Sequence, residues 1–269
     1  MSSNALVSGL VLSIITLVPL GMKWELEKKI IIPSAFLIGI VSWVVVEGLS
    51  FFVDLKLYQI FVIQAIVISG TSISLLLWRF FRDPERIPPD NANVILSPAD
   101  GTIIYVKKIK NGEIPFSEKS GRKFTLTDFV QHDFLPAGGY LIGIAMNFLD
   151  VHINRAPIGG RIILLKHIKG LFISLKKKEA VIQNERVFMV IENQLITVGI
   201  VQIASRLVRK IVPYIEKGKD VKIGQRIGVI KFGSQVDIVI PDFPKIQMMV
   251  KNGIKVKAGT TIIANIQNS

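Results

Sequence analysis

Cysteine is absent from this chain of 269 residues, and histidine occurs only three times, as His132, His152 and His167. Without cysteine the protein has no disulfides, no thiolate metal ligands and no thiol nucleophile. The three histidines lack the close spacing of a zinc site, so we expect no bound metal. The chemistry of this protein must therefore come from other side chains.

Acidic residues are also scarce, because 20 Asp and Glu face 33 Lys and Arg, and the net charge is +13. Residues 1–78 hold four basic and four acidic residues, which leaves 29 basic against 16 acidic residues for 79–269. A basic domain tethered beside a membrane attracts anionic lipid headgroups. Aromatic residues are not interleaved with the basic clusters and no nucleic-acid-binding motif occurs, so we expect membrane lipids as partners and no nucleic acid.

Long apolar runs are concentrated at the start of the chain, at Ala5 to Met22, Ile30 to Val46 and Leu57 to Trp78. Each run is long enough to cross a bilayer. No basic residue precedes the first run, so we expect a permanent anchor and not a cleaved signal peptide. Pro19 and Gly21 weaken the end of the first run, which leaves two interpretations open: three spans, or two spans with a surface or re-entrant helix.

Basic residues around these runs predict the orientation of the anchor. The linker between the first two runs contains three lysines, the next linker contains only Lys56, and three arginines follow Trp78: Arg79, Arg82 and Arg86. The positive-inside rule therefore predicts a multi-pass protein of the cell membrane with residues 79–269 on the cytoplasmic side. We expect Glu47 near the outer end of the second run, because a charge at the membrane centre would be costly.

Beyond a Pro-rich exit at residues 84–98, short β-branched runs alternate with turn residues, which predicts a mainly β sandwich or barrel over residues 79–269. We expect one helix, from about Ala204 to Lys217, although Pro213 opposes it. The segments VKIGQRIG (221–228) and VKAGTTII (256–263) repeat a V-K-x-G pattern typical of hairpins in lipoyl-type β-sandwich domains. A carrier domain of that kind would need an acceptor lysine, for which Lys245 is the candidate.

Three polar segments interrupt the β pattern: SPADG with Asp100, NFLDVHINRAP with His152, and the pair Gly233-Ser234. Each has a structural interpretation, respectively a turn-capping carboxylate, a buried histidine and a strand bulge. Together they supply a carboxylate, an imidazole and a hydroxyl, the parts of a base-activated nucleophile. The serine does not sit in a G-x-S-x-G elbow, so an ordinary hydrolase is a weak hypothesis.

The motifs FFRDPERIPP, SPADG, LDVHINRAP followed by GG, NER (184–186) and FGS resemble, in order and spacing, the phosphatidylserine decarboxylase proenzymes, in particular the short form described in archaea as archaetidylserine decarboxylase. The resemblance covers about residues 79–265. It implies that Ser234 attacks the carbonyl of Gly233 with Asp100 and His152 as the base. Cleavage would give a β chain (1–233) and an α chain (234–269) whose first residue becomes a pyruvoyl cofactor.

The resemblance further implies that this pyruvoyl group is the electron sink for decarboxylation of a serine phospholipid, phosphatidylserine or archaetidylserine, to the ethanolamine lipid and carbon dioxide. Two positions depart from the best-known members, with Gln235 where they have threonine and Leu149 where bacterial forms have a further histidine. The alternative from another class is a non-catalytic, membrane-tethered β-sandwich carrier or adaptor. Symmetry favours a homodimer, but the sequence leaves the oligomeric state open.

Overall fold

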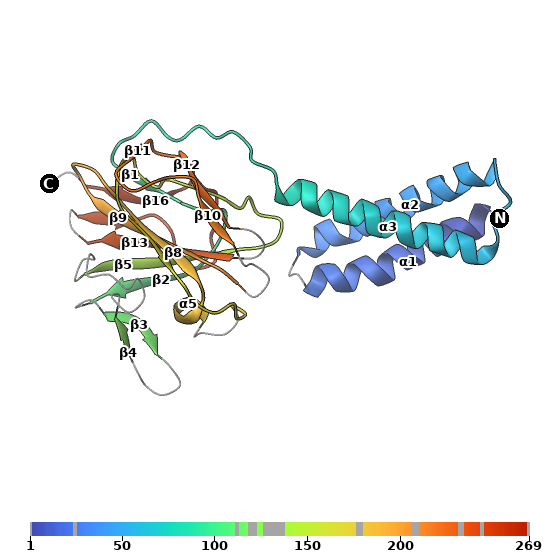
Figure 1. Ribbon diagram of the computed structural model, residues 1–269, viewed down its shortest axis with the longest axis horizontal. Coiled ribbons are helices and arrows are strands. Elements are labelled where there is room, and N and C mark those ends of the chain that lie inside the picture. The colour runs from blue at the N-terminus through green and yellow to red at the C-terminus, as the bar shows by residue number, and fades with distance from the viewer. Residues whose placement is uncertain are drawn as a thin grey trace. The chain divides into compact units, whose positions relative to one another are not determined.

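The chain forms two compact units in the computed structural model (Figure 1). The helical unit is Met1–Arg82 together with Asn147–Leu149, and the β unit is Asp83–Met146 together with Asp150–Ser269. The structure describes residues 2–23, 26–110, 113–117, 123–125, 138–175, 180–205, 210–230, 234–242 and 245–267.

The helical unit contains α1 (Ser2–Lys23), α2 (Lys28–Ser50) and α3 (Leu57–Phe80). All three helices are long and apolar enough to cross a membrane, as the hydrophobic runs predicted. The first run forms one helix with Pro19 inside it, because a bilayer favours helix even where proline removes one donor. Glu47 lies in the last turn of α2, close to its C-terminal end.

Small and polar residues hold the three helices together. A Cβ atom added to Gly9 would lie 2.9 Å from the carbonyl oxygen of Gly39, so α1 and α2 approach backbone to backbone. The buried side chain of Gln64 in α3 donates to the carbonyl of Ala5 (2.6 Å) and accepts from the hydroxyl of Ser8 (2.8 Å). These bonds tie α3 to the first third of α1.

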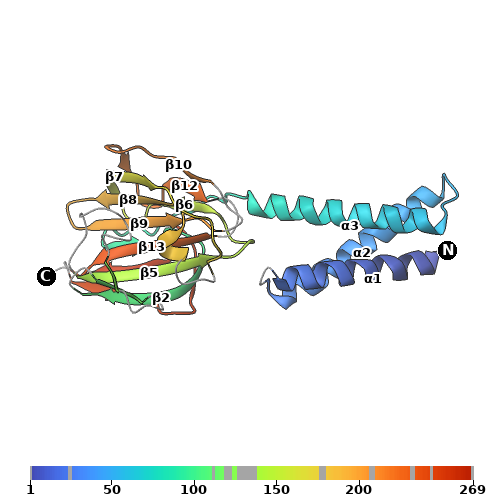
Figure 2. The same cartoon turned by 60° about the horizontal axis from the view of Figure 1, so that its bottom comes forward.

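The β unit is built on one antiparallel sheet of eight strands. In spatial order the strands are β11 (Asp220–Val221), β7 (Gly160–Ile168), β8 (Arg186–Glu192), β9 (Thr197–Ile203), β13 (Ser234–Pro241), β5 (Gly139–Met146), β2 (Gly101–Ile109) and β15 (Lys255–Val256). Figure 2 shows the central strands side by side. The expectation of a mainly β domain is confirmed.

Two smaller sheets complete the unit, and their strands are β1 (Val94–Leu96), β16 (Ile262–Ile266) and β14 (Ile246–Met248) in one, and β10 (Ile211–Pro213), β12 (Arg226–Ile230) and β6 (Ile153–Arg155) in the other. The pair β3 (Glu113–Ser117) and β4 (Lys123–Thr125) and the short α5 (Ala180–Gln183) lie outside these sheets. Alternate residues of β13, such as Val236 and Ile238, share one core with Ile95 of β1, Ile263 of β16 and Ile227 of β12. The small sheets therefore cover one face of the large sheet, as in a sandwich.

The V-K-x-G repeats occupy matching places at the two edges of the large sheet. Val221 of the first repeat pairs with Gly160, which begins β7, and Val256 of the second pairs with Gly101, which begins β2. Both β2 and β7 have nine residues and carry an irregularity near their start. The repeat is thus a structural device that closes both edges of the sheet with a short strand.

The expected helix from Ala204 to Lys217 is wrong where the structure describes it. Ile211 to Pro213 form strand β10, which pairs with β12, and residues 206–209 lie outside the described part of the chain. Proline cannot continue a helix, but it is tolerated on an edge strand, which is the place of β10 in its sheet. The apolar residue Ile211 is buried because this side of strand β10 faces the core.

The segment Asp83–Arg86 is fixed to the β unit by a chain of ion pairs. Asp83 bonds Arg155 (3.1 Å) and Arg226 (2.5 Å), and Glu85 bonds Arg226 (2.6 Å). The side chain of Arg155 is only 4% exposed, and it also donates to the carbonyl of Pro84 (3.0 Å). The Pro-rich exit seen in the sequence is therefore an ordered strap and not a loose linker.

We expect Asp83→Asn to destabilise the β unit by about 3 kcal/mol, because the buried Arg155 guanidinium loses its carboxylate. The midpoint of thermal unfolding of the intact protein, followed by β-sheet circular dichroism, should fall by roughly 6 to 12 °C. Glu85→Gln is the matched control, since its side chain is 84% exposed and such pairs contribute less than about 1 kcal/mol. Equal midpoints for the two variants would contradict this role of Asp83.

Candidate active site

One end of the large sheet collects segments that are far apart in the sequence. A continuous row of paired residues crosses the sheet there: Arg186 with Ile203, Ile203 with Gln235, Gln235 with Ala145, and Ala145 with Thr102. The row lies at the start of β8, β13 and β2 and at the end of β9 and β5. The motifs NER, FGS, SPADG and LDVHINRAP therefore begin or end at this same end of the large sheet.

Asp100 precedes β2 at this end, and its carboxylate forms a two-pronged ion pair with Arg86. The guanidinium nitrogens lie 2.5 and 2.8 Å from the two carboxylate oxygens, and the backbone amide of Ala258 donates a third bond (2.8 Å). The two side chains are 10% and 9% exposed. These three bonds join the SPADG turn to Arg86 and to the backbone at Ala258.

His152 is almost fully buried, and its environment assigns the ring tautomer. Its Nδ1 lies 2.9 Å from the carbonyl oxygen of Asp150. A carbonyl can only accept, so Nδ1 carries the hydrogen and Nε2 is the proton-accepting nitrogen of the neutral ring. In its neutral form the imidazole would therefore present Nε2 as the acceptor nitrogen that a general base requires.

Ser234 is the first residue of β13, where it is paired with Met146 at the end of β5. Four residues earlier, the amide of Ile230 donates to the carbonyl of His152 (3.3 Å). The chain from Ile230 to Ser234 is thus bracketed by two contacts with the chain from Met146 to His152. The structure brings His152 and Ser234 to one place in the fold, while Gly233, the other predicted cleavage residue, lies outside the described residues.

Asp100 lies at the same end of the sheet, as the strand pairing of the residues next to it shows. Thr102 and Gln235 both pair with Ala145, from opposite sides of β5, so they stand about 10 Å apart across two strand spacings. Asp100 lies two residues before Thr102, and Ser234 lies one residue before Gln235. All three predicted catalytic residues are therefore gathered in one region by the topology of the sheet.

A model of the phosphatidylserine decarboxylase family matches residues 73–264. The chain belongs to the phosphatidylserine decarboxylase family. It is 44% identical to a putative archaetidylserine decarboxylase proenzyme of Methanocaldococcus jannaschii, over 71% of this chain and 91% of the relative. It is 37% identical to the protein of the same description from Methanothermobacter thermautotrophicus, over 75% and 85% of the two chains.

A bacterial relative, the phosphatidylserine decarboxylase proenzyme of Pelodictyon phaeoclathratiforme, is 37% identical over 73% of this chain and 81% of its own length. The resemblance read from the five motifs is confirmed. The family match begins within α3 and covers the whole row of paired strands described above.

A buried amide pair, which the sequence did not predict, lies next to the histidine motif of this decarboxylase-family fold. The side chain of Gln202 donates to that of Asn154 (2.7 Å), and both residues are completely buried. The remaining amide hydrogens of Asn154 and the oxygen of Gln202 have no hydrogen-bond partner among the described residues. Gln202 stood in an apolar β run, so nothing in the sequence marked it as a neighbour of the site.

The NER motif, whose role the sequence left open, holds a loop in place. Asn184 exchanges two hydrogen bonds with the backbone of Ile173 (2.9 and 2.8 Å) and donates to the carbonyl of Ala204 (2.8 Å). Arg186 is buried, and this burial lowers the pKa of its guanidinium to about 10, so it stays charged at neutral pH. The motif therefore supplies both a rigid loop and a desolvated cation at the sheet end.

Gln235, which replaces the threonine of better-known family members, belongs to a buried polar cluster. Its amide nitrogen donates to the oxygens of Tyr105 and Asp237 (both 2.7 Å), and Tyr105 donates to Asp237 (2.6 Å). Burial raises the pKa of the Asp237 carboxyl from 3.8 to about 7, against the opposing effect of the two hydrogen bonds. The residue after Ser234 is therefore locked to a carboxyl that titrates near neutral pH.

This carboxyl predicts a pH-dependent stability. Because the pKa of Asp237 is raised on folding, the folded protein binds this proton more tightly than the unfolded chain does, which adds to the free energy of unfolding. This contribution is complete below about pH 4 and is lost as the pH rises through about 7. Asp237→Asn should remove the effect, so its free energy of unfolding relative to wild type should rise by about 3 kcal/mol between pH 5 and pH 8. Chemical denaturation at both values measures it. Asp220→Asn, at an exposed position, should follow the wild-type slope, and an Asp237→Asn slope equal to wild type would contradict the prediction.

Proposed function

We propose that this protein is a membrane-anchored, self-processing decarboxylase that converts a serine phospholipid to the ethanolamine phospholipid and carbon dioxide. Family membership supports the reaction class, and its relatives are described as phosphatidylserine and archaetidylserine decarboxylase proenzymes. The observation that carries the proposal is the row of paired residues that joins the starts of β2, β8 and β13 to the end of β5.

In the proposed self-cleavage, the Ser234 hydroxyl oxygen attacks the carbonyl carbon of Gly233, and His152 accepts the hydroxyl proton at Nε2. The peptide C–N bond breaks as the new ester C–O bond forms, and the proton moves to the freed amine. Loss of the α hydrogen of residue 234 then breaks its Cβ–Oγ bond and releases the Gly233 carboxylate. Water converts the dehydroalanine at residue 234 to a pyruvoyl group and ammonia.

The structure fits such a group, because cutting before Ser234 leaves β13 held on both sides by β5 and β9. The released segment 234–269 also supplies β14, β15 and β16, which pair with strands of the 1–233 segment or with each other. The two chains therefore stay assembled, and the new terminus stays at the sheet end. When formed, the pyruvoyl group supplies the electron sink for loss of carbon dioxide.

The remaining residues have positional and proton-transfer roles. Asp100, held in place by Arg86 and the Ala258 amide, would assist His152 as the base for self-cleavage. After it takes up a proton from the solvent, His152 would donate that proton to the carbon that loses carbon dioxide. The basic β unit on the cytoplasmic side of the membrane draws the anionic substrate toward the site.

The test uses the full-length protein in vesicles that contain serine phospholipid labelled with ¹⁴C in the serine carboxyl group. Trapped ¹⁴CO₂ and an equal amount of ethanolamine lipid are expected, with phosphatidylserine and archaetidylserine compared side by side. Processed protein that releases no carbon dioxide from either lipid would overturn the proposal.

A further inference from the structure

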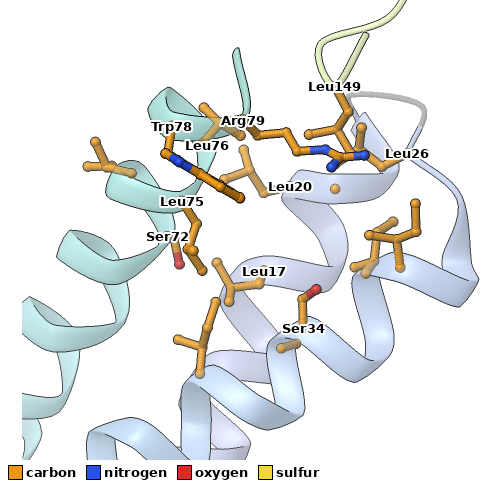
Figure 3. A pocket seen from close by; sticks show the side chains of 16 residues that line it. Leu17, Leu20, Leu26, Ser34, Ser72, Leu75, Leu76, Trp78, Arg79 and Leu149 are labelled. Carbon is orange, nitrogen blue, oxygen red and sulfur yellow. The ribbon is translucent and has the colours of Figure 1, made fainter. Parts of the chain in front are cut away.

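An apolar cavity opens between the C-terminal halves of α1 and α3 and the N-terminal half of α2 (Figure 3). Its volume is about 500 Å³, and its wall includes Leu17, Ile31 and Leu76. Gln64 ties α3 to the opposite end of α1, so the two helices are joined at one end and separated by this space at the other. In a bilayer, such an opening is filled by a hydrocarbon chain and not by water.

The polar groups of the cavity lie where a phospholipid headgroup region would be. Figure 3 shows the Arg79 side chain extending over the end of the cavity toward Leu26 and Leu149. Among the described residues no carboxylate forms an ion pair with Arg79. Trp78 is 71% exposed beside it, as is typical of residues at the membrane interface. The positive-inside rule puts this end of the helices at the cytoplasmic leaflet.

Leu149 gives the cavity a link to the proposed chemistry. It belongs to the helical unit together with Phe148, whose ring lies 5.6 Å from that of Phe80. In the sequence, His152 follows Leu149 by only three residues.

We propose that this cavity, hereafter the lipid slot, binds one hydrocarbon chain of the serine phospholipid substrate, with the lipid phosphate on Arg79. The inference rests on the proposed function for the identity of the headgroup. A volume of about 500 Å³ is in the range of small-ligand sites. Leu149, at a position where bacterial relatives are expected to have a histidine, is one of the apolar residues that line the slot in this chain.

The direct test is photolabelling of the full-length protein in phosphatidylcholine vesicles with phosphatidylserine that carries a diazirine in one acyl chain. Labels should concentrate on peptides of α1 and α3 that line the slot. Ser72→Trp, which fills the slot from α3, should reduce this labelling about tenfold or more. Ile66→Trp is the matched control, because Ile66 is 66% exposed on α3 and does not line the slot. Equal labelling of Ser72→Trp and wild type would overturn the proposal.

Kinetics on the same variants separate binding from chemistry. Ser72→Trp should raise the KM for long-chain phosphatidylserine about tenfold with little change in kcat. It should leave turnover of short-chain, water-soluble phosphatidylserine unchanged, which a general folding defect would not do. Arg79→Gln should raise the KM as well, and Arg82→Gln, outside the slot, should not. A Ser72→Trp protein that loses both activities equally would contradict a role in chain binding.

Failure of the proposed function would be recognised separately. If wild-type protein releases no carbon dioxide, the decarboxylase proposal fails, and the photolabelling still decides whether the slot holds a lipid chain. If the decarboxylase is active but labels spread evenly over the outer helix faces, the slot alone is disproved.

Discussion

Ser234→Ala should yield a single uncut chain of 29.9 kDa with no decarboxylase activity. Alanine lacks the hydroxyl that attacks the preceding carbonyl, so neither the chain break nor the pyruvoyl group can form. Intact-mass spectrometry of purified protein measures the result directly. Wild-type protein should show two chains, and the shorter one, residues 234–269, should lack a free amino terminus.

Ser174→Ala provides the matched control, because Ser174 is a partly exposed serine elsewhere in the β unit and its removal should leave processing intact. Active wild-type protein found as one chain, with an ordinary serine at residue 234, would contradict the proposed mechanism. The carrier alternative predicts a different pattern, in which Ser234→Ala keeps its function and Lys245 carries a modification.

His152→Ala should slow self-cleavage by about 10² to 10⁴-fold, the usual contribution of a positioned general base. The side chain is almost fully buried with Nδ1 directed at the Asp150 carbonyl, so we expect Nε2 to be the atom that accepts the proton. The fraction of cut protein is followed with time after cell-free synthesis in the presence of vesicles, by gel electrophoresis.

His167→Ala is the control for this prediction. The His167 side chain lies on β7, is 55% exposed and pairs with Glu185. Processing of the His167→Ala variant should therefore match that of wild type. Wild-type cleavage rates in His152→Ala would show that another group accepts the proton, and would leave His152 a structural role only.

Some residues at this end of the sheet could be predicted from the sequence, and others could not. Asp100, His152 and Ser234 could be selected because each is a reactive residue type in an otherwise apolar β pattern. Arg86 was visible in the sequence only as one of several arginines after the last apolar run, although it holds Asp100 with two hydrogen bonds. Their separation of 14 residues across a Pro-rich strap has no periodicity that would predict the contact.

Buried polar partners were the other gap. Gln202 and Asp237 lie in β runs whose alternation correctly predicted strands, but the sequence did not show that their side chains meet Asn154 and Tyr105. The predicted helix at Ala204 to Lys217 failed for a related reason, since β10 is stabilised by its pairing with β12 and not by local preference. Local propensity is a weak guide where partners are distant in the sequence.

The sequence by itself determined the three apolar helices, the mainly β nature of the second unit and the residue types available for chemistry. These properties depend on the length and alternation of apolar residues, which are local along the polypeptide. Only the tertiary structure decided that four motifs meet at one sheet end, that Asp100 is paired with Arg86, and that a cavity separates α1 from α3. Strand register and helix packing depend on contacts between residues tens of positions apart, and such contacts leave no periodic trace in the sequence.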